Sequence, residues 1–401
     1  MKIALYNAKV YVERERFVEA VLVEDRKIKA IGTNEEILAT TDIDEKIDCE
    51  GKTVIPGLND SHMHIFNFGE RMCQVAIGDC ESIDEMIDRC KKYVEENPDS
   101  VKHGLYAQGW NQDYFTDSDR IPNRFDLDKI STEIPVVLER ICGHILTTNT
   151  KTIELLGIDA KSPQYPGGTF EIGEDGYPNG IFAENACNYA KNVIPKADIK
   201  QRKKMFIEAS EYAAEHGITT VQSNDLGTIV FDYPEYFKFF KDIYNSGEGI
   251  VRYRHQISFE TVEEFKDYIE NGEFKNGKYD EDSLIQLGPL KLFKDGSLGA
   301  RTALVRGGYK DDPTNNGIEW MSEEVMDEFC KVASDAGIQV ATHVIGDGAI
   351  EKTIDSYEKT FGEEGNKLRH TLVHCQITDK ALLERIAKLG IVVSYQPIFL
   401  D

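Results

Sequence analysis

Two histidines separated by one residue, His62 and His64, give the first chemical signal in this sequence. They follow a short apolar run and a turn in the segment that spans residues 53–64. Side chains two residues apart in an extended strand lie on the same face. Both imidazoles would therefore point at one spot, which is how two histidines share a metal ion.

Two later histidines end predicted strands in a similar way. His343 closes a strand over residues 338–343, and His374 closes one over residues 371–374. The carboxyl ends of parallel barrel strands meet at one face, where active sites lie. We therefore expect these rings to converge with the first pair. His144 follows another predicted strand, over residues 135–140, and could reach the same pocket.

Lys291 lies within an apolar strand, where a charged ammonium group is costly to bury. Burial lowers the pKa of an amine, and a neutral amine can take up carbon dioxide to become a carbamate. A carbamate on this long side chain is suited to bridging two metal ions. The alternative is that Lys291 reaches the barrel mouth and pairs with Asp295 or with a substrate.

The remaining histidines do not share this placement. His216 and His370 stand at strand starts, at the opposite end of a barrel, and His103 lies among surface charges. We expect His216 to be structural, and we expect neither His370 nor His103 to belong to the site. The position of His255 leaves its role open.

The pattern of elements predicts a barrel. Residues 1–52 read as short strands, the first of them over residues 3–12. From residue 53 strands alternate with amphipathic helices, one of them over residues 83–95, as in βα units around a parallel sheet. Helix–glycine–strand junctions recur at Gly337 and Gly390. This repetition favours a (β/α) barrel over an open sheet. We expect a small β domain over residues 1–52 and the barrel over residues 53–401.

Composition excludes several classes of protein. The chain has 401 residues, 41% of them apolar, and a formal net charge of −25, which would repel a nucleic-acid backbone. No run of eighteen apolar residues and no signal-peptide core occurs. The eight cysteines include no Cys-x-x-Cys pair and read as reduced thiols. We expect a cytoplasmic protein with no membrane or nucleic-acid partner.

The chain resembles the amidohydrolase superfamily, and within it the YtcJ-like branch (amidohydrolase family 3), which includes N-substituted formamide deformylases. The matching segments are Val54–His64, Gly109-Trp110-Asn111, Gly143-His144, Gly167-Gly168-Thr169, Pro178-Asn179-Gly180-Ile181, Lys291–Gly299 and His343–Asp347. Together these segments cover nearly the whole sequence.

The resemblance implies a distorted (β/α)8 TIM-type barrel with a small β-sandwich built from both chain ends. It also implies a homodimer and one or two bound metal ions, with zinc as the expected ion. The implied metal ligands are His62, His64, Lys291 (in its free or its carboxylated form), His343 and His374. The implied catalytic residues are His343, Lys291 and His144. His144 and the loop 296–301 are similar to substrate-facing positions, with barrel-mouth packing as the alternative.

One departure from the family pattern concerns the end of the chain. The pattern continues to an eighth strand with an aspartate in a Ser-Asp turn, and then to the closing half of the sandwich. The last residues here, 396–401, lack that turn, and Asp401 is too close to the seventh strand to replace it. We therefore expect a truncated chain with weakened metal binding and low activity.

The resemblance implies a metal-dependent hydrolase that uses activated water on a non-peptide carbon–nitrogen bond of a small amide or N-acyl substrate. One alternative is a hydrolytic deaminase of a ring substrate, which usually works with one metal and no carboxylated lysine. Another is a non-catalytic relic or metal-binding module.

Overall fold

The computed structural model describes residues 1–401 except 117, 119, 142, 144, 167, 226–232, 273–283, 300, 363–364 and 398–401. Its centre is a sheet in which all neighbouring strands run parallel. In spatial order the strands are β19 (Val392–Tyr395), β18 (Thr371–His374), β17 (Val340–Val344), β16 (Ile285–Phe293), β15 (Arg252–Ile257), β14 (Ile218–Ser223) and β8 (Leu58–Met63). The expected (β/α) pattern is therefore present from β8 onward.

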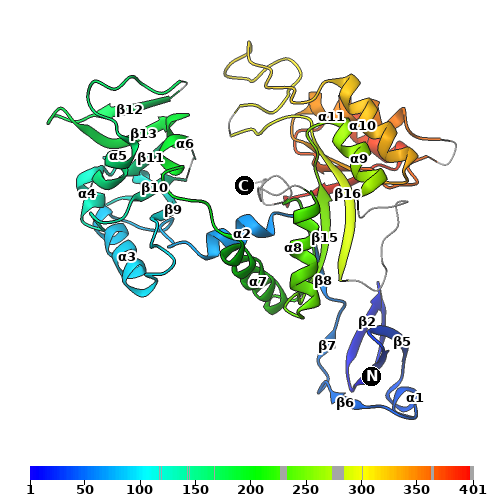
Figure 1. Cartoon of the computed structure of the whole chain (residues 1–401). Helices are drawn as coiled ribbons and strands as arrows, with labels where there is room; N and C mark the ends of the chain where they lie inside the picture. The colour runs from blue at the N-terminus through cyan, green and yellow to red at the C-terminus, as the bar shows by residue number, and fades with distance from the viewer. Residues whose placement is uncertain are drawn as a thin grey trace.

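Helices precede or follow these strands in the sequence and cover the outside of the sheet (Figure 1). They are α2 (Ile65–Met72), α7 (Ile199–Glu215), α8 (Tyr233–Asn245), α9 (Val262–Asn271), α10 (Glu323–Asp335), α11 (Asp347–Glu358) and α12 (Lys380–Leu389). Their apolar faces form one core with the strands. In that core Phe240 of α8 stacks on Tyr253 of β15 with ring centroids 4.4 Å apart, and Phe206 of α7 packs edge-on against both. Fully buried aromatic rings of this size stabilise the strand–helix layers strongly.

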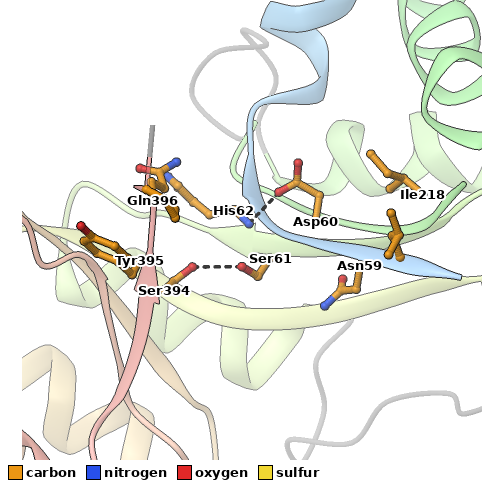
Figure 2. Close-up of a pocket in the computed structure, with 10 residues that line it drawn as sticks. Asn59, Asp60, Ser61, His62, Ile218, Ser394, Tyr395 and Gln396 are labelled. Carbon is orange, nitrogen blue, oxygen red and sulfur yellow. Dashed lines mark hydrogen bonds between the residues drawn. The ribbon is translucent and has the colours of Figure 1, made fainter. Parts of the chain in front are cut away.

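The parallel sheet curls until its two outer strands meet, so the barrel is nearly closed. Ser61 of β8 and Ser394 of β19 hydrogen-bond through their hydroxyl oxygens at 3.1 Å. A groove of about 500 Å³ runs along this seam (Figure 2). Leu58 and Tyr395, which line the groove, are 52% and 46% exposed. The eighth strand and the aspartate implied by the family pattern remain a prediction.

A separate mixed sheet lies between α2 and α7 in the sequence. Its strands, in spatial order, are β12 (Gly168–Ile172), β13 (Pro178–Glu184), β11 (Ile145–Thr148), β10 (Val136–Arg140) and β9 (Leu105–Trp110). The helices α3 (Ile83–Glu96), α4 (Arg124–Asp128), α5 (Thr150–Leu156) and α6 (Ala186–Lys191) pack with it, and η1 (Gln112–Tyr114) follows β9.

This sheet lies to one side of the barrel in Figure 1. The predicted strand over residues 135–140 therefore exists, as β10, but it does not belong to the parallel sheet. A buried apolar strand has the same sequence pattern in either sheet, because the pattern reports burial and not the partner strand.

The first 54 residues form two small sheets. One has the order β5 (Lys27–Gly32), β4 (Ala20–Glu24), β1 (Lys2–Tyr6) and β6 (Glu45–Asp48); the other has β3 (Arg16–Val18), β2 (Lys9–Glu13) and β7 (Thr53–Val54). Helix α1 (Asn34–Leu38) begins at a capping box in which Thr33 and Glu36 exchange hydrogen bonds. The two sheets agree with the short strands expected over residues 1–52. The completed sandwich and the boundary at residues 52 and 53 remain predictions.

Two other sequence-based expectations can be compared with the described residues. No helix among them combines the length and apolar composition that crossing a bilayer requires. All seven cysteines that the structure describes are free thiols.

Candidate metal centre

The carboxyl end of β8 places the His-x-His pair on one face. His62 lies in the strand, and His64 is the residue immediately before α2. Their ring centroids are 5.3 Å apart. The backbone N–H of Ile65 donates to the Ser223 hydroxyl at 2.9 Å, so the strand-to-helix junction is tied to the neighbouring β14.

The ends of β17 and β18 bring the other two imidazoles to the same place. In the parallel register His343 lies beside Phe293 of β16, and His374 lies beside Val344. The His343 and His374 rings are 4.5 Å apart, and the His374 ring is 5.1 Å from that of His62. His374 has a φ of +69°, an unusual value for a residue other than glycine. Such conformations concentrate at functional sites.

Each of the four rings bonds an oxygen atom through one nitrogen. The contacts are His62 Nδ1 with Gln256 Oε1 (3.2 Å), His64 Nδ1 with the Asn224 carbonyl (2.7 Å), His343 Nε2 with the Gly296 carbonyl (2.9 Å) and His374 Nδ1 with Gln396 Oε1. A carbonyl oxygen only accepts, so the bonded ring nitrogen carries the proton. In a neutral imidazole the other nitrogen then has the lone pair that a metal ion binds.

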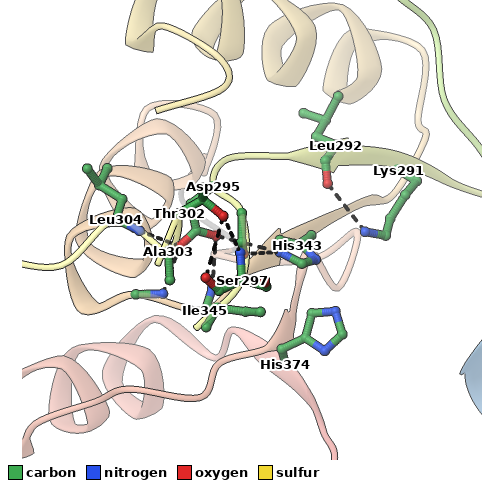
Figure 3. A network of polar contacts seen from close by, with 12 residues as sticks. Lys291, Leu292, Asp295, Ser297, Thr302, Ala303, Leu304, His343, Ile345 and His374 are labelled. Carbon is green, nitrogen blue, oxygen red and sulfur yellow. Dashed lines mark hydrogen bonds and ion pairs between the residues drawn. The ribbon is translucent and has the colours of Figure 1, made fainter. Parts of the chain in front are cut away.

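Lys291 of β16 extends into the same region, and none of the acidic residues that the structure describes pairs with it. The residue is 1% exposed, and Figure 3 draws its side chain. The Lys291 Nζ lies 3.9 Å from the centroid of the Phe293 ring. In the described part of the chain, no carboxylate forms an ion pair with this amine. Burial lowers the pKa of Lys291 to about 7, so much of the amine is neutral at physiological pH.

The pairing of Lys291 with Asp295 considered from the sequence does not occur. The Asp295 carboxylate, fully buried, instead accepts the backbone N–H groups of Leu304, Ile345 and Gly346 at 2.8–3.0 Å (Figure 3). Asp295 therefore fastens the loop after β16 to the end of β17. The second buried lysine, Lys294, pairs with Glu319 at 2.7 Å.

Burial also keeps three of the imidazoles neutral. It lowers the pKa of His62 and of His343 to about 3, and the pKa of His374 to about 4. The positive charge of Lys291 depresses all three pKa values further. At neutral pH these rings therefore present lone pairs and no positive charge, which is the protonation state that metal binding needs.

The donor set and its spacing fit a divalent metal ion. Two imidazoles that share a zinc ion, each with a Zn–N distance of ~2 Å, have ring centroids roughly 5 Å apart. The separations of 4.5, 5.1 and 5.3 Å are close to this value. Among the described residues no three His, Cys, Asp or Glu side chains are arranged to hold a metal ion as they stand. Binding would therefore need the rings to turn toward a common point.

The other described histidines lie elsewhere or make structural contacts. His144 falls outside the described residues. His370 is buried before β18 and bonds Ser334, while His216 is exposed at the end of α7 and bonds the Tyr212 carbonyl. His255 is fully buried in β15, and its Nδ1 bonds the Tyr236 hydroxyl at 3.0 Å.

The sequence did not single out three amide residues that contact the rings. Asn224 follows β14, Gln256 lies in β15 and Gln396 follows β19. Amide side chains near the carboxyl end of a strand are common. Their position was therefore the only sequence signal that could have identified them as partners of the histidines. A search of every such end for polar residues would have found all three.

The depressed histidine pKa values predict loss of stability in mild acid. Each folded-state value lies below the unfolded value of 6.5, so the unfolded chain binds more protons as pH falls through that range. We expect the unfolding free energy of the metal-free protein to drop by several kcal/mol between about pH 6.5 and 4. Urea unfolding at each pH measures this. In the His62→Gln variant the unfolding free energy should drop less between about pH 6.5 and 5. An equal drop would contradict the lowered pKa of His62.

A protein-family model described as "Amidohydrolase family" matches residues 45–401. This chain belongs to the amidohydrolase family. The family's "Putative amidohydrolase YtcJ" of Bacillus subtilis (strain 168) is 30% identical over 95% of this chain and 70% of its own length. An "N-substituted formamide deformylase" of Arthrobacter pascens is 24% identical over 96% of this chain and 70% of its own length. The resemblance to the YtcJ-like branch is thus confirmed.

A solved structure and a plant protein extend the comparison within the family. The chain superimposes on "an uncharacterized metal-dependent hydrolase" from Pyrococcus furiosus with a TM-score of 0.76 and 26% identity, covering 100% of this chain and 78% of that one. It is also 30% identical to "Protein LONG AFTER FAR-RED 3" of Arabidopsis thaliana, over 88% of this chain. The chain spans only 60% of that protein's length.

Proposed function

We propose that this amidohydrolase is a metal-dependent hydrolase of a non-peptide carbon–nitrogen bond in a small amide or N-acyl substrate. The observation that carries the proposal is the gathering of four imidazoles and one buried amine at the carboxyl end of a parallel barrel. These side chains come from β8, β16, β17 and β18, which are far apart in the sequence. The family membership and the metal-dependent structural relative support the same function.

The residues that would hold the metal are His62, His64, His343 and His374, with Lys291 as a fifth ligand. Zinc suits neutral imidazoles with an open coordination position. When bound, a divalent ion of this kind acts as a Lewis acid toward water and a carbonyl group. The metal's identity and the number of ions, one or two, are part of the proposal.

Lys291 would become a ligand by carboxylation. Its neutral Nζ attacks carbon dioxide, a nitrogen–carbon bond forms, and one proton leaves to solvent. Burial supports this step because it lowers the pKa of Lys291 to about 7 and leaves a nucleophilic amine. Among the described residues no carboxylate pairs with the Lys291 amine. The carbamate would therefore bind the metal ion without competition from a neighbouring side-chain carboxylate.

The protein's own residues would orient the substrate and exclude water. The loop after β16, which the Asp295 carboxylate fastens to β17, would form one wall of the pocket. His144 and the loop 296–301 are proposed to face the substrate. The homodimer and the cytoplasmic location implied by the resemblance stay predictions.

The proposal is tested by hydrolysis assays on the purified protein. Aliphatic and aromatic N-formyl and N-acetyl amines are offered, and the released amine is measured. We expect a metal chelator to abolish release and added Zn²⁺ to restore it. Amine release that survives complete metal removal would contradict metal dependence, and no release from any substrate would contradict the substrate class. An added carboxyl mass on Lys291 separates this function from deamination of a ring.

A further inference from the structure

One buried amide group contacts the first histidine of the pair and fixes its own orientation. Gln256 in β15 is 3% exposed. Its Nε2 donates to the Ser61 carbonyl at 3.2 Å, and its Oε1 lies 3.2 Å from His62 Nδ1. Because only the NH₂ group can donate to a carbonyl, the amide oxygen must face His62. The His62 proton therefore stays on Nδ1.

A second buried residue, Asn224, bonds the other histidine and is hydrogen-bonded to the backbone of Gln256. Asn224 is 5% exposed, and its backbone carbonyl accepts from His64 Nδ1 at 2.7 Å. Its backbone N–H donates to the Met63 carbonyl at 3.2 Å. Its side-chain Nδ2 donates to the Gln256 carbonyl at 2.7 Å and to the Ser258 hydroxyl at 2.9 Å. The two residues thus link the ends of β8, β14 and β15.

The result is a pair of imidazoles with the same tautomer. His62 and His64 both carry the proton on Nδ1, which leaves the Nε2 lone pair of each for a metal ion. Both acceptors are neutral carbonyl oxygens and not carboxylates. A neutral acceptor fixes the tautomer without adding negative charge, so the ring remains a less basic ligand than one bonded to a carboxylate.

We propose that Gln256 and Asn224 are positioning residues that set the affinity of the His62–His64 pair for its metal ion. The inference rests on the proposed metal-dependent function. It adds that Gln256, which has no direct bond to the ion, controls how tightly the ion is held. Partners of this kind typically change metal affinity by about 10- to 100-fold when they are removed.

Zn²⁺ binding by variants of the full chain tests the inference. Gln256→Met keeps the side-chain length and removes the acceptor, and we expect it to raise the Zn²⁺ Kd by about 10- to 100-fold. Gln256→Glu keeps an oxygen at His62, and its Kd should stay within a factor of about ten of the parent value. The matched control is Gln339→Leu. Gln339 lies at the amino end of β17 and donates to the Arg369 carbonyl and the Thr371 hydroxyl, so its loss should leave the Kd unchanged.

The outcomes separate this inference from the proposed function. A parent protein that binds no Zn²⁺ or Co²⁺ would overturn the proposed function itself. A parent that binds Zn²⁺ with a Kd that Gln256→Met leaves unchanged would overturn the inference alone. The Co²⁺ absorption spectrum is a second readout, because a turned His62 ring changes the ligand geometry and hence the spectrum.

A measurement on the unmodified protein covers the case in which Gln256→Met does not fold. In metal-free protein labelled with ¹⁵N-histidine, the ring nitrogens report the tautomer directly. We expect both His62 and His64 to be in the Nδ1–H form. Their signals are assigned by comparison with variants in which one of these two histidines is replaced. The Nε2–H form at His62 would overturn the inference without any change to Gln256.

Discussion

Replacing His62 or His343 by alanine is expected to remove bound metal and to lower kcat/KM by roughly a thousandfold or more. The reason is that each ring supplies one lone pair to a shared site, and a lost Lewis acid forfeits several kcal/mol of transition-state stabilisation. Metal analysis and hydrolysis assays on the same preparations measure both effects.

The barrel should survive these two substitutions. Both rings are partly buried in a polar pocket and lie outside the apolar core that joins strands and helices. The control is His216→Ala, because that ring is exposed at the end of α7 and bonds only within its own helix among the contacts described. We expect its metal content and activity to equal those of the parent. Full metal content in His62→Ala would contradict the assignment.

Replacing Lys291 by methionine is expected to stabilise the metal-free protein while it removes a ligand. The burial that lowers the pKa of Lys291 from 10.5 to about 7 disfavours its charged form. At ~1.4 kcal/mol for each pKa unit, the buried ammonium costs on the order of 4 kcal/mol near pH 7. Methionine fills the same volume without a charge, so we expect a gain of about 2–4 kcal/mol.

The pH dependence of that gain follows from linkage. Since the folded-state pKa lies below the unfolded value, the destabilisation is complete below about pH 7, and it fades as pH rises toward the unfolded value of 10.5. The advantage of Lys291→Met should therefore shrink between pH 7 and 10. Urea unfolding of the parent and of Lys291→Met, each with a chelator at pH 7 and at pH 10, measures this difference in unfolding free energy.

Lys294 provides the matched control for this prediction. It is three residues away, equally buried, and pairs with Glu319 at 2.7 Å while donating to the Met321 carbonyl at 2.7 Å. Lys294→Met should therefore destabilise the protein, by about 1–3 kcal/mol, because it breaks a satisfied contact. Destabilisation of the same size in Lys291→Met would contradict the view that Lys291 is retained for function.

Many elements of the fold were predictable because they have strong local sequence signals. The helix expected over residues 83–95 is α3 (Ile83–Glu96), and the strands ending at His343 and His374 are β17 and β18. Gly390 ends α12 in the left-handed conformation, as the helix–glycine–strand pattern implied. The strand expected from residue 3 to 12 is instead two strands, because Asn7 turns the chain with a φ of +52°.

What the sequence could not supply was the sheet to which each strand belongs and the partners of each polar group. Strand β10 reads like a barrel strand but pairs with β9 and β11. Asp295, four residues after Lys291, reads like its ion-pair partner but is committed to three backbone N–H groups. Register and hydrogen bonding between distant segments decide such questions, and neither leaves a periodic trace in the sequence.

X-ray anomalous scattering from crystals of the metal-loaded protein shows directly where the metal ion binds. We expect an anomalous zinc peak at ~2.0–2.1 Å from Nε2 of His62 and of His64, with His343 and His374 around the same one or two ions. A zinc peak elsewhere in the molecule, or four imidazoles without metal in crystals grown with excess zinc, would contradict it.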